Sequence, residues 1–273
     1  MKKEKIKNQL STKQEITWCP GCLNFSILES VKNTIADLIK EKKYNKKDFA
    51  FVTGIGCHAK IFDYLNLSGF YGLHGRVLPT ALGIKIGNPN LKVLGFGGDG
   101  DTYSEGISHF IHAFRYNADM TMIVHDNQSF SLTTGQATAT SQKGFKTKAE
   151  PFGEIHEPLN PVKIALACGG SFIARCNPLD IKHTSLILRK AIEHKGFSYV
   201  EMIQKCLIFN PEMNNLDKLM YKVKDNTDYK KAQKLVEEWD YNSNKGKIPL
   251  GILYKSKKQI FEEKYPQLKK MLK

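Results

Sequence analysis

Short apolar runs alternate with stretches of helical periodicity along most of the chain. Strands are predicted at Phe49–Thr53, Leu91–Gly95 and Thr121–Val124, because each run is apolar and leads into Gly, Asp or Asn. Between the second and third runs, the apolar residues of Ser104–Tyr116 recur every three or four positions, which predicts a helix. This alternation indicates an α/β fold with a doubly wound, mostly parallel sheet.

The same alternation continues further along the chain. We predict a strand at Phe172–Ala174, a helix at Ile181–His194 and a strand at Ser198–Ile203. The helix is preceded by Pro178 and Asp180, residue types that are common near the start of a helix. These elements add a further βα unit to the predicted sheet.

The composition divides the chain into three parts. Residues 1–14 are rich in lysine, and residues 210–273 are polar and rich in lysine apart from one apolar strand at Ile248–Tyr254. The α/β pattern lies between them, over residues 15–209. We expect the last part to pack on the α/β domain as an extension rather than to form a second domain.

The chain is basic, with 41 Lys and Arg residues, 27 Asp and Glu residues and a net charge of +14. This excess fits either an ordinary solvated surface or an acidic partner, such as an electron-carrier protein or a second subunit. No nucleic-acid-binding motif accompanies the charge, so no nucleic-acid partner is expected. Because no segment is typical of a signal peptide or a membrane span, we expect a cytoplasmic protein with no membrane partner.

A glycine-rich run, Gly-Gly-Asp-Gly-Asp over residues 97–101, follows the predicted strand Leu91–Gly95. Ligands of open parallel sheets bind beyond the carboxyl ends of the strands, where glycines let backbone N–H groups approach a phosphate. Asp99 is a suitable Mg²⁺ ligand, and Asn127 lies 28 residues later, one helix and one strand away. The pair predicts a site for Mg²⁺ and a diphosphate, although Gly-Asp-Gly alone also fits an ordinary turn.

Four of the six cysteines are candidates for a metal site. Cys19 and Cys22 form a Cys-x-x-Cys knuckle, which occurs in redox dithiols, zinc sites and iron–sulfur sites. No strand pattern precedes the knuckle, which argues against a thioredoxin-like dithiol. Cys57 and Cys206 each follow a predicted strand, so they can lie at the same edge of the sheet as the glycine-rich run. The two cysteines that we expect to be structural are Cys168 and Cys176.

Eight sequence blocks occur in a specific order and spacing between Trp18 and Tyr254. They are WCPGC (18–22), GIGCHAK (54–60), GLHGRVLPTALGIKIGNPNL (72–91), GGDGD (97–101), HFIHAFRYN (109–117), HDNQSFSLTTGQ (125–136), HKGFSYVE (194–201) and IPLGILY (248–254). Together they resemble the β subunits of the 2-oxoacid:ferredoxin oxidoreductases. The resemblance implies a thiamine diphosphate-binding type of sheet and the oxidative decarboxylation of a 2-oxoacid, with coenzyme A as the acyl acceptor.

The resemblance also implies a site for thiamine diphosphate and Mg²⁺. Asp99, Asn127 and the backbone carbonyl of Ser129 would bind the metal ion. The other residues implied to contact the cofactor are Gly56, Cys57, His58, His74, Gly98, Gly100, Asp101, Ser131, Leu132 and Thr133. His74 and Arg76 are implied as catalytic residues of the substrate pocket.

By the same resemblance, one [4Fe–4S] cluster would pass electrons one at a time to ferredoxin. The implied cluster ligands are Cys19, Cys22, Cys57 and Cys206. Thiamine enzymes also need a glutamate from a pyrimidine-binding module, and this chain is too short to carry that module as well. A separate α subunit is therefore expected to supply it, with the cofactor between the two subunits.

Three positions depart from the pattern of the family. Leu23 follows the first knuckle where many relatives have Gly, and Phe130-Ser131-Leu132 replaces the usual Tyr-Gly-Leu. Thr134 stands where some relatives have Lys, in a loop that would line the substrate pocket. The absence of a cation there weakens the case for a dicarboxylic 2-oxoacid.

Two other classes of protein fit part of the sequence. A non-oxidative thiamine enzyme, such as a decarboxylase or synthase subunit, would need the Mg²⁺ motif but has no use for four convergent cysteines. A zinc-knuckle protein or a basic nucleic-acid binder would not require Asp99 and Asn127 to lie one helix and one strand apart.

Overall fold

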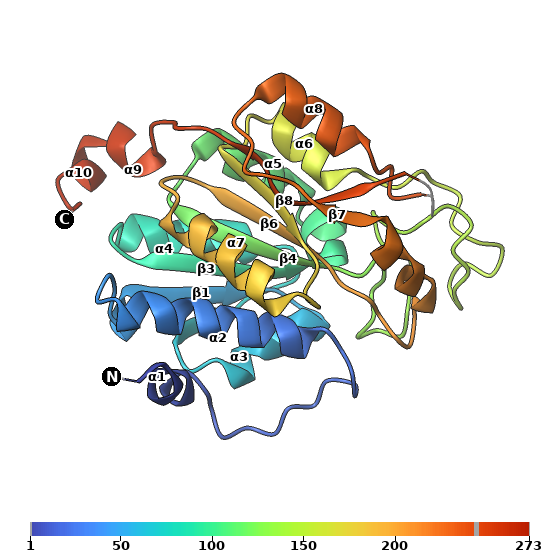
Figure 1. Ribbon diagram of the computed structural model, residues 1–273, viewed down its shortest axis with the longest axis horizontal. Coiled ribbons are helices and arrows are strands. Elements are labelled where there is room, and N and C mark those ends of the chain that lie inside the picture. The colour runs from blue at the N-terminus through green and yellow to red at the C-terminus, as the bar shows by residue number, and fades with distance from the viewer. Residues whose placement is uncertain (1, 243–245, 273) are drawn as a thin grey trace.

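An eight-stranded sheet forms the centre of the computed structural model (Figure 1), which describes residues 2–242 and 246–272. Residue 1 of the basic segment, and residues 243–245 and 273 of the C-terminal extension, lie outside the described residues. The strands are β1 (Phe49–Thr53), β2 (Ser68–Tyr71), β3 (Lys92–Gly98), β4 (Met120–Asp126), β5 (Phe172–Cys176), β6 (Ser198–Ile203), β7 (Met220–Lys222) and β8 (Ile248–Lys255).

The strands lie in the order β2-β1-β3-β4-β6-β5-β8-β7. The first six are mutually parallel, β8 pairs antiparallel with β5, and β7 pairs parallel with β8. All residues of β1, β4, β5 and β6 are buried, because helices cover both faces of the sheet. The edge strand β2 differs, since all four of its residues are exposed.

Helices form a layer on each face of the sheet. They are α1 (Lys3–Gln9), α2 (Asn24–Lys40), α3 (Ile61–Tyr64), α4 (Val77–Gly87), α5 (Ile107–Tyr116), α6 (Pro161–Ala167), α7 (Ile181–Glu193), α8 (Tyr229–Glu237), α9 (Phe261–Lys264) and α10 (Pro266–Lys269). The α2 and α7 helices pack together in front of the sheet in Figure 1, with α1 outside α2. Helices α4, α5, α6 and α8 bury their apolar side chains in a second core on the opposite face. Within residues 2–242 and 246–272, none of the helices has the length and apolar character needed to span a bilayer.

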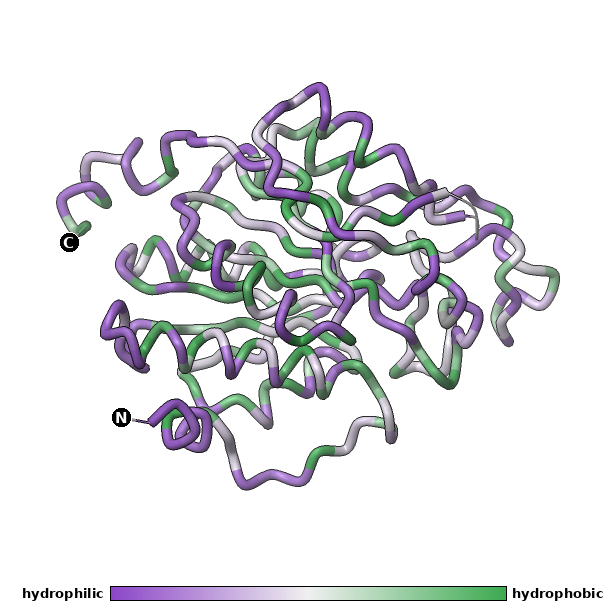
Figure 2. The backbone as a smooth tube through the Cα atoms, in the orientation of Figure 1, coloured by the Kyte–Doolittle hydropathy of each residue, from purple (hydrophilic) through white to green (hydrophobic). Residues whose placement is uncertain are grey.

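The sequence explains why the main helices form where they do. In α2, the apolar residues Ile27, Val31 and Ile35 recur on one face and are buried. The α7 helix begins after Asp180, whose carboxylate accepts a hydrogen bond from the backbone N–H of His183 at 3.0 Å. The hydropathy of the chain follows this arrangement, with alternating bands along the helices and mostly apolar strands between them (Figure 2).

The structure confirms the predicted α/β class and most of the predicted elements. The strands β1 and β6 have the predicted bounds, whereas β3 and β4 each extend beyond the predicted apolar run. The helix predicted at Ser104–Tyr116 begins only at Ile107, because Gly100–Glu105 forms a wider π-helical turn. The α4 helix was not predicted, because its apolar residues are not confined to one face.

The C-terminal segment extends the central sheet. Its strands β7 and β8 continue the sheet beyond β5, and β8 is almost completely buried. The segment from residue 210 onward is therefore integrated with the sheet, and a domain boundary at residue 209 stays a prediction.

A buried ion pair connects β5, β6 and this C-terminal segment. The Arg175 guanidinium on β5 donates to the Glu201 carboxylate on β6 at 2.6 Å and to the Tyr241 hydroxyl at 2.7 Å. Tyr241 in turn donates to Glu201 at 2.6 Å. The side chains of Arg175 and Glu201 are 1% and 0% exposed, so removal of either would leave the other charge unpaired in the interior.

Replacement of this arginine tests the role of the ion pair. Arg175→Met should lower the free energy of unfolding by about 3–5 kcal/mol, because Glu201 loses its charged partner in the interior. Urea denaturation of the purified chain measures the change. Arg189→Met is the matched control, since Arg189 pairs with Glu41 at the surface, where an ion pair contributes about 0–1 kcal/mol. Equal losses in the two variants would contradict the structural role of Arg175.

Candidate functional site

Two neighbouring cavities lie beyond the carboxyl ends of the central strands. From β1 the chain passes to β2 on one side and then returns to β3 on the other side. Ligands of open α/β sheets bind at such a switch point. We name the two cavities after what lines them: the glycine-loop cavity, lined by Gly98 and Gly100, and the cysteine cavity, lined by four cysteines.

The glycine-loop cavity has a volume of about 70 Å³ and is formed by the loops that follow β1, β2, β3 and β4. Its lining residues are Ile55, Gly56, Cys57, His58, His74, Gly98, Asp99, Gly100, Asp101, Ser129, Phe130, Ser131, Leu132 and Thr133. The structure thus brings together every cofactor contact expected from the sequence except Asn127, which lies beside the cavity rather than in its lining.

Asp99 directly follows β3, and its carboxylate is buried. The Oδ2 atom accepts hydrogen bonds from the hydroxyls of Thr138 at 2.6 Å and Thr140 at 3.3 Å. Burial raises the pKa of Asp99 to about 6, although these hydroxyls and the backbone N–H of Asn127 favour the charged form. A cation at this carboxylate would relieve the cost of burying its charge.

Asn127 and Ser129 follow β4, the strand beside β3. The pairing of Gly98 with His125 makes the two strands end side by side, so Asp99 lies next to the residues that follow β4. The Asn127 Oδ1 atom accepts a hydrogen bond from the backbone N–H of Ser129 at 3.1 Å, which closes a tight turn. A carboxylate, an amide and a backbone carbonyl thus lie on neighbouring loops at the same edge of the sheet, and this donor set suits Mg²⁺.

The Asp101 carboxylate holds two loops of the cavity together. Its Oδ1 atom accepts hydrogen bonds from the backbone N–H groups of Gly75 at 2.7 Å and Ile55 at 3.3 Å. The His74 Nδ1 atom lies 3.3 Å from Oδ1, and the His58 Nε2 atom lies 3.6 Å from Oδ2. Asp101 therefore lies between two histidine rings and can fix their orientation at the cavity wall.

Two glycines permit the close packing of this region. A Cβ atom at Gly54 would lie 1.9 Å from the Asp101 Oδ2 atom, and one at Gly100 would lie 2.2 Å from the Phe130 ring. The Phe130 ring lies directly on the glycine-rich loop and has its centre 5.8 Å from that of the His74 ring. Any larger residue at either glycine would displace a side chain of the site.

Two residues expected in the substrate pocket do not line the glycine-loop cavity. Arg76 is exposed at the start of α4, and its guanidinium lies 3.5 Å from the Gly75 carbonyl. Thr134 has a φ angle of 75°, which is unusual for a β-branched residue. The structure places His74 but not Arg76 in the cavity, and a catalytic role for either stays a prediction.

The cysteine cavity adjoins the first cavity and has a volume of about 170 Å³. Its lining residues are Thr17, Trp18, Cys19, Cys22, Cys57, Lys60, Ser131, Leu132, Gln204, Lys205, Cys206, Leu207, Ile208 and Phe209. The two cavities share Cys57, Ser131 and Leu132 as a common wall. The structure therefore brings together all four cysteines that the sequence predicted as metal ligands.

Hydrogen bonds hold the cysteine-bearing segments in place. The Trp18 indole N–H donates to the Cys57 carbonyl at 2.7 Å and joins the first knuckle to the loop after β1. The Ser131 hydroxyl donates to the Cys206 Sγ atom at 3.4 Å and joins the loop after β4 to the segment after β6. These contacts explain why cysteines far apart in the sequence face one cavity.

The thiols influence one another electrostatically. Burial, followed by the proximity of Cys22 and Cys206, raises the pKa of Cys57 to about 11. Burial also raises the pKa of Cys22, although the Gln204 amide donates to its Sγ atom at 3.6 Å. A bound metal centre would reverse this preference, because a cation stabilises thiolates.

The four thiols surround a cavity rather than a point. Across the part of the chain that the structure describes, no three His, Cys, Asp or Glu side chains are grouped closely enough to hold a single metal ion. Cys168 and Cys176 lie outside the cavity. Cys176 is buried at the end of β5, and Cys168 packs half-buried against the apolar core after α6.

Three polar residues that contact the predicted ligands were not predicted from the sequence. Thr138 and Thr140 bind the Asp99 carboxylate, and Gln204 reaches the Cys22 sulfur. A single hydroxyl or amide carries no periodic or spacing signal. The only hint was that Gln204 lies two residues before Cys206 at the end of a predicted strand.

Comparisons with known proteins agree with this geometry. A family model described as "Thiamine pyrophosphate enzyme, C-terminal TPP binding domain" matches residues 54–202, which include the loops of the glycine-loop cavity. A second family model, which describes the C-terminal part of the pyruvate ferredoxin oxidoreductase beta chain, matches residues 208–270.

Curated relatives and a solved structure extend the similarity over nearly the whole chain. A 2-oxoacid:ferredoxin oxidoreductase subunit beta from Saccharolobus solfataricus is 38% identical over 88% of this chain and 81% of the relative. The 2-oxoglutarate synthase subunit KorB from Methanocaldococcus jannaschii is 31% identical over 94% of this chain and 93% of the relative. A solved structure is also similar, that of 2-oxoglutarate:ferredoxin oxidoreductase from Magnetococcus marinus with 2-oxoglutarate, coenzyme A and succinyl-CoA bound. The match has a TM-score of 0.90 and 29% sequence identity, and it covers 97% of this chain and 89% of that chain.

The buried carboxylate predicts a pH-dependent cost to stability in the metal-free chain. The folded chain holds the Asp99 proton up to a pKa of about 6, whereas the unfolded chain releases it near the ordinary value of 3.8. Stability from this group is therefore lost as the pH rises between these values. Asp99→Asn has no proton to lose, so at neutral pH it should raise the free energy of unfolding.

Urea denaturation in the presence of a chelator, carried out at several pH values, measures this difference. The advantage of the variant should grow as the pH rises toward the folded-state pKa and then remain constant. Thr121→Val, which alters another buried polar side chain near the start of β4, serves as a control with no such pH dependence. An Asp99→Asn variant that is less stable than the native chain at neutral pH would contradict the assigned cost of burial.

Proposed function

The chain belongs to the family of 2-oxoacid:ferredoxin oxidoreductase β subunits, and we propose on this premise that it joins a thiamine diphosphate site to a [4Fe–4S] cluster. As an oxidoreductase subunit, it acts with a partner subunit in the coenzyme A-dependent oxidation of a 2-oxoacid. The observation that carries the proposal is the common wall of Cys57, Ser131 and Leu132 between the glycine-loop and cysteine cavities. This wall would separate the place of decarboxylation from the place of electron storage by a single layer of residues.

The glycine-loop cavity has a donor set that fits Mg²⁺ and a diphosphate. Asp99, Asn127 and the Ser129 carbonyl would hold the metal ion, while Gly98 and Gly100 leave room for the phosphates. Bound thiamine diphosphate would supply the nucleophilic carbon and the electron sink for decarboxylation. The position of the Asp99 carboxylate in the lining of this cavity, directly after β3, supports this proposal.

The chain's own residues prepare the cavity for this chemistry. Asp101 lies beside the rings of His74 and His58, and these rings would be available to bind substrate or transfer protons at the cavity wall. The Phe130 ring covers Gly100 and excludes water from one side of the cavity. Leu132 adds an apolar contact on the side shared with the cysteine cavity.

The cysteine cavity fits an iron–sulfur cluster better than a single metal ion. Fe–S clusters are commonly held by four thiolates, and the four thiols here surround a cavity of about 170 Å³. The proposed ligands are Cys19, Cys22, Cys57 and Cys206. Gln204 and Ser131 donate to two of the sulfurs, and such hydrogen bonds adjust the reduction potential of a cluster.

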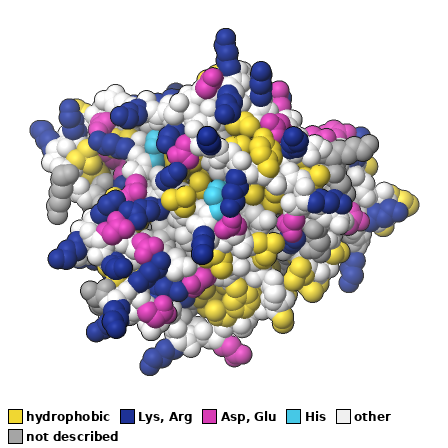
Figure 3. Space-filling view, in the orientation of Figure 1, with side chains coloured by type: hydrophobic (Ala, Val, Ile, Leu, Met, Phe, Trp, Pro, Cys, Tyr) yellow, Lys and Arg dark blue, Asp and Glu magenta, His cyan; other side chains and the backbone are white. Residues whose placement is uncertain are grey.

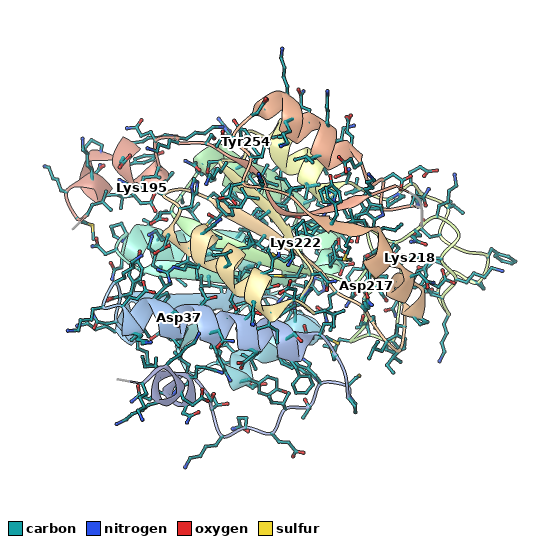
Figure 4. The ribbon with its side chains drawn as sticks, in the orientation of Figure 1. Asp37, Lys195, Asp217, Lys218, Lys222 and Tyr254 are labelled. Carbon is teal, nitrogen blue, oxygen red and sulfur yellow. The ribbon has the colours of Figure 1, made fainter. Side chains whose placement is uncertain are left out.

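Electrons would leave through the outer side of the cysteine cavity. Cys19 is exposed there, and Lys60 lines the same cavity. Lys205 is paired with Asp217, which lies on the segment after Cys206 (Figure 4). Lys and Arg side chains are spread among Asp and Glu over the face in Figure 3. The net charge of +14, rather than one basic patch, therefore supports an acidic acceptor, and we propose ferredoxin.

The partner subunit would supply the pyrimidine-binding module. The glycine-loop cavity is formed by loops of a single sheet edge and is open on one side, which leaves room for a second chain to cover a bound cofactor. The names of the relatives, as β subunits, support a second polypeptide. A non-oxidative thiamine enzyme would also use the glycine-loop cavity, but it would leave four convergent thiols without a role.

Reconstitution with the partner subunit tests whether the pyrimidine-binding module lies on a second polypeptide. The purified chain alone should show no 2-oxoacid oxidation, because the activating glutamate of the pyrimidine-binding module is expected in the partner. Addition of the partner should restore coenzyme A-dependent reduction of a viologen dye under anaerobic conditions. Sustained oxidation of a 2-oxoacid by the single chain would overturn the proposed arrangement.

Replacement of single cysteines tests the cluster ligands. Cys→Ser at any of the four cavity positions should remove most of the iron, about four atoms per chain in a native [4Fe–4S] site, and bleach the brown absorbance. Cys168→Ser is the matched control and should retain its iron, because Cys168 lies outside the cavity. If Cys206→Ser keeps a full cluster while Cys176→Ser loses it, the fourth ligand is assigned wrongly.

A further inference from the structure

We propose that Thr138 and Thr140 are positioning residues that orient the Asp99 carboxylate for Mg²⁺. This inference rests on the proposed function of the glycine-loop cavity. Neither threonine lines that cavity, so both would act on the metal ion only through Asp99. Both belong to the segment that follows the loop after β4, outside the sequence blocks that predicted the metal site.

The hydrogen bonds are directed at one oxygen of the carboxylate. The Thr138 hydroxyl donates to Asp99 Oδ2 at 2.6 Å, and the Thr140 hydroxyl lies 3.3 Å from the same atom. Within the described parts of the chain, no side-chain hydroxyl, amide or cation donates to Oδ1, whereas the backbone N–H groups of Asp99 and Asn127 also donate to the carboxylate. Thr140 also lies 3.0 Å from Asp126 Oδ1 and therefore bridges two buried carboxylates.

All four side chains are shielded from water. Thr138 is 7% exposed, Asp99 2%, and both Thr140 and Asp126 are fully buried. Because water cannot replace a missing hydroxyl at such a site, the orientation of Asp99 depends on the protein donors. Thr138 makes the shorter hydrogen bond to Asp99 and does not contact a second carboxylate. It should therefore contribute more than Thr140 to the orientation of Asp99.

Hydrogen bonds fix the segment that carries the two threonines to the turns that follow β3 and β4. The Ser141 hydroxyl donates to the Gln128 carbonyl at 2.6 Å and accepts the backbone N–H of Thr138 at 2.8 Å. The backbone N–H of Ala139 donates to the Ser104 hydroxyl at 3.1 Å. Residues 138–141 thus bridge the turn after β4 and the π-helical turn after β3, so the hydroxyls are held in place before any ligand binds.

A carboxylate ligand that is oriented by hydrogen bonds binds its metal more tightly. Loss of such a partner lowers metal affinity by about 10–100-fold in characterised sites. Thr138→Val keeps the shape of the side chain and removes only the hydroxyl. It should therefore raise the Mg²⁺ concentration needed for half-maximal retention of thiamine diphosphate by about 10-fold or more.

The experiment uses the complex of this chain with its partner subunit. Bound thiamine diphosphate is measured after gel filtration over a series of Mg²⁺ concentrations, without any assay of turnover. Thr138→Ser should retain nearly native behaviour, because serine keeps the donor. Thr121→Val is the matched control, since it removes a buried hydroxyl of β4 that bonds the Ala191 carbonyl away from the site.

The position of the Mg²⁺ midpoint distinguishes orientation from a general structural role. A merely structural threonine would lower the melting temperature or the maximal cofactor content and leave the midpoint unchanged. If Thr138→Val does not fold, Thr140→Val should show a smaller shift in the same direction. An unchanged midpoint in a folded variant overturns the inference. A native complex that retains no thiamine diphosphate even at saturating Mg²⁺ overturns the proposed metal site, and the inference with it.

Discussion

The parallel pairing of the central strands is the constraint on which the site depends. Gly98 on β3 is opposite His125 on β4, and Asp126 on β4 is opposite Ile203 on β6. Strands in this register end together, so the residues that follow them meet although they are far apart in the sequence. An antiparallel arrangement would have sent these loops to opposite edges of the sheet, and neither cavity would have formed.

The interior treats its buried charges in two different ways. Arg175 and Glu201 neutralise each other and join the C-terminal segment to the sheet. Asp99 has no cationic side chain as a hydrogen-bond partner among the described residues, and only hydroxyl and backbone donors stabilise its charge. The first arrangement neutralises its charges within the protein, whereas the second leaves a buried carboxylate whose cost of burial a bound cation would relieve. Because of this contrast, we assign a structural role to the Arg175–Glu201 pair and propose a ligand-binding role for Asp99.

The sequence predicted features that leave a pattern in the order of residues. Buried parallel strands appear as apolar runs, so β1 and β6 were predicted with their observed bounds. Asp99 and the four cavity cysteines were found because each follows a strand or belongs to a short motif. Cys57 was expected at both sites, but the sequence did not predict Thr138, or that Ser131 and Leu132 also line the cysteine cavity, because these contacts depend on how loops pack against one another. The family resemblance implied Arg76 as a pocket residue, whereas the structure places it at the start of α4, outside the lining of the glycine-loop cavity.

The central claim is that thiamine-dependent oxidation and electron storage occur on the two sides of one wall. Freeze-quench electron paramagnetic resonance of the anaerobic complex, mixed with a 2-oxoacid and coenzyme A in the absence of ferredoxin, tests it most directly. The account predicts that the signal of a reduced [4Fe–4S] cluster forms on mixing and requires bound thiamine diphosphate. A cluster that dithionite can reduce, but that stays oxidised after the 2-oxoacid is added to the cofactor-loaded complex, would contradict the account.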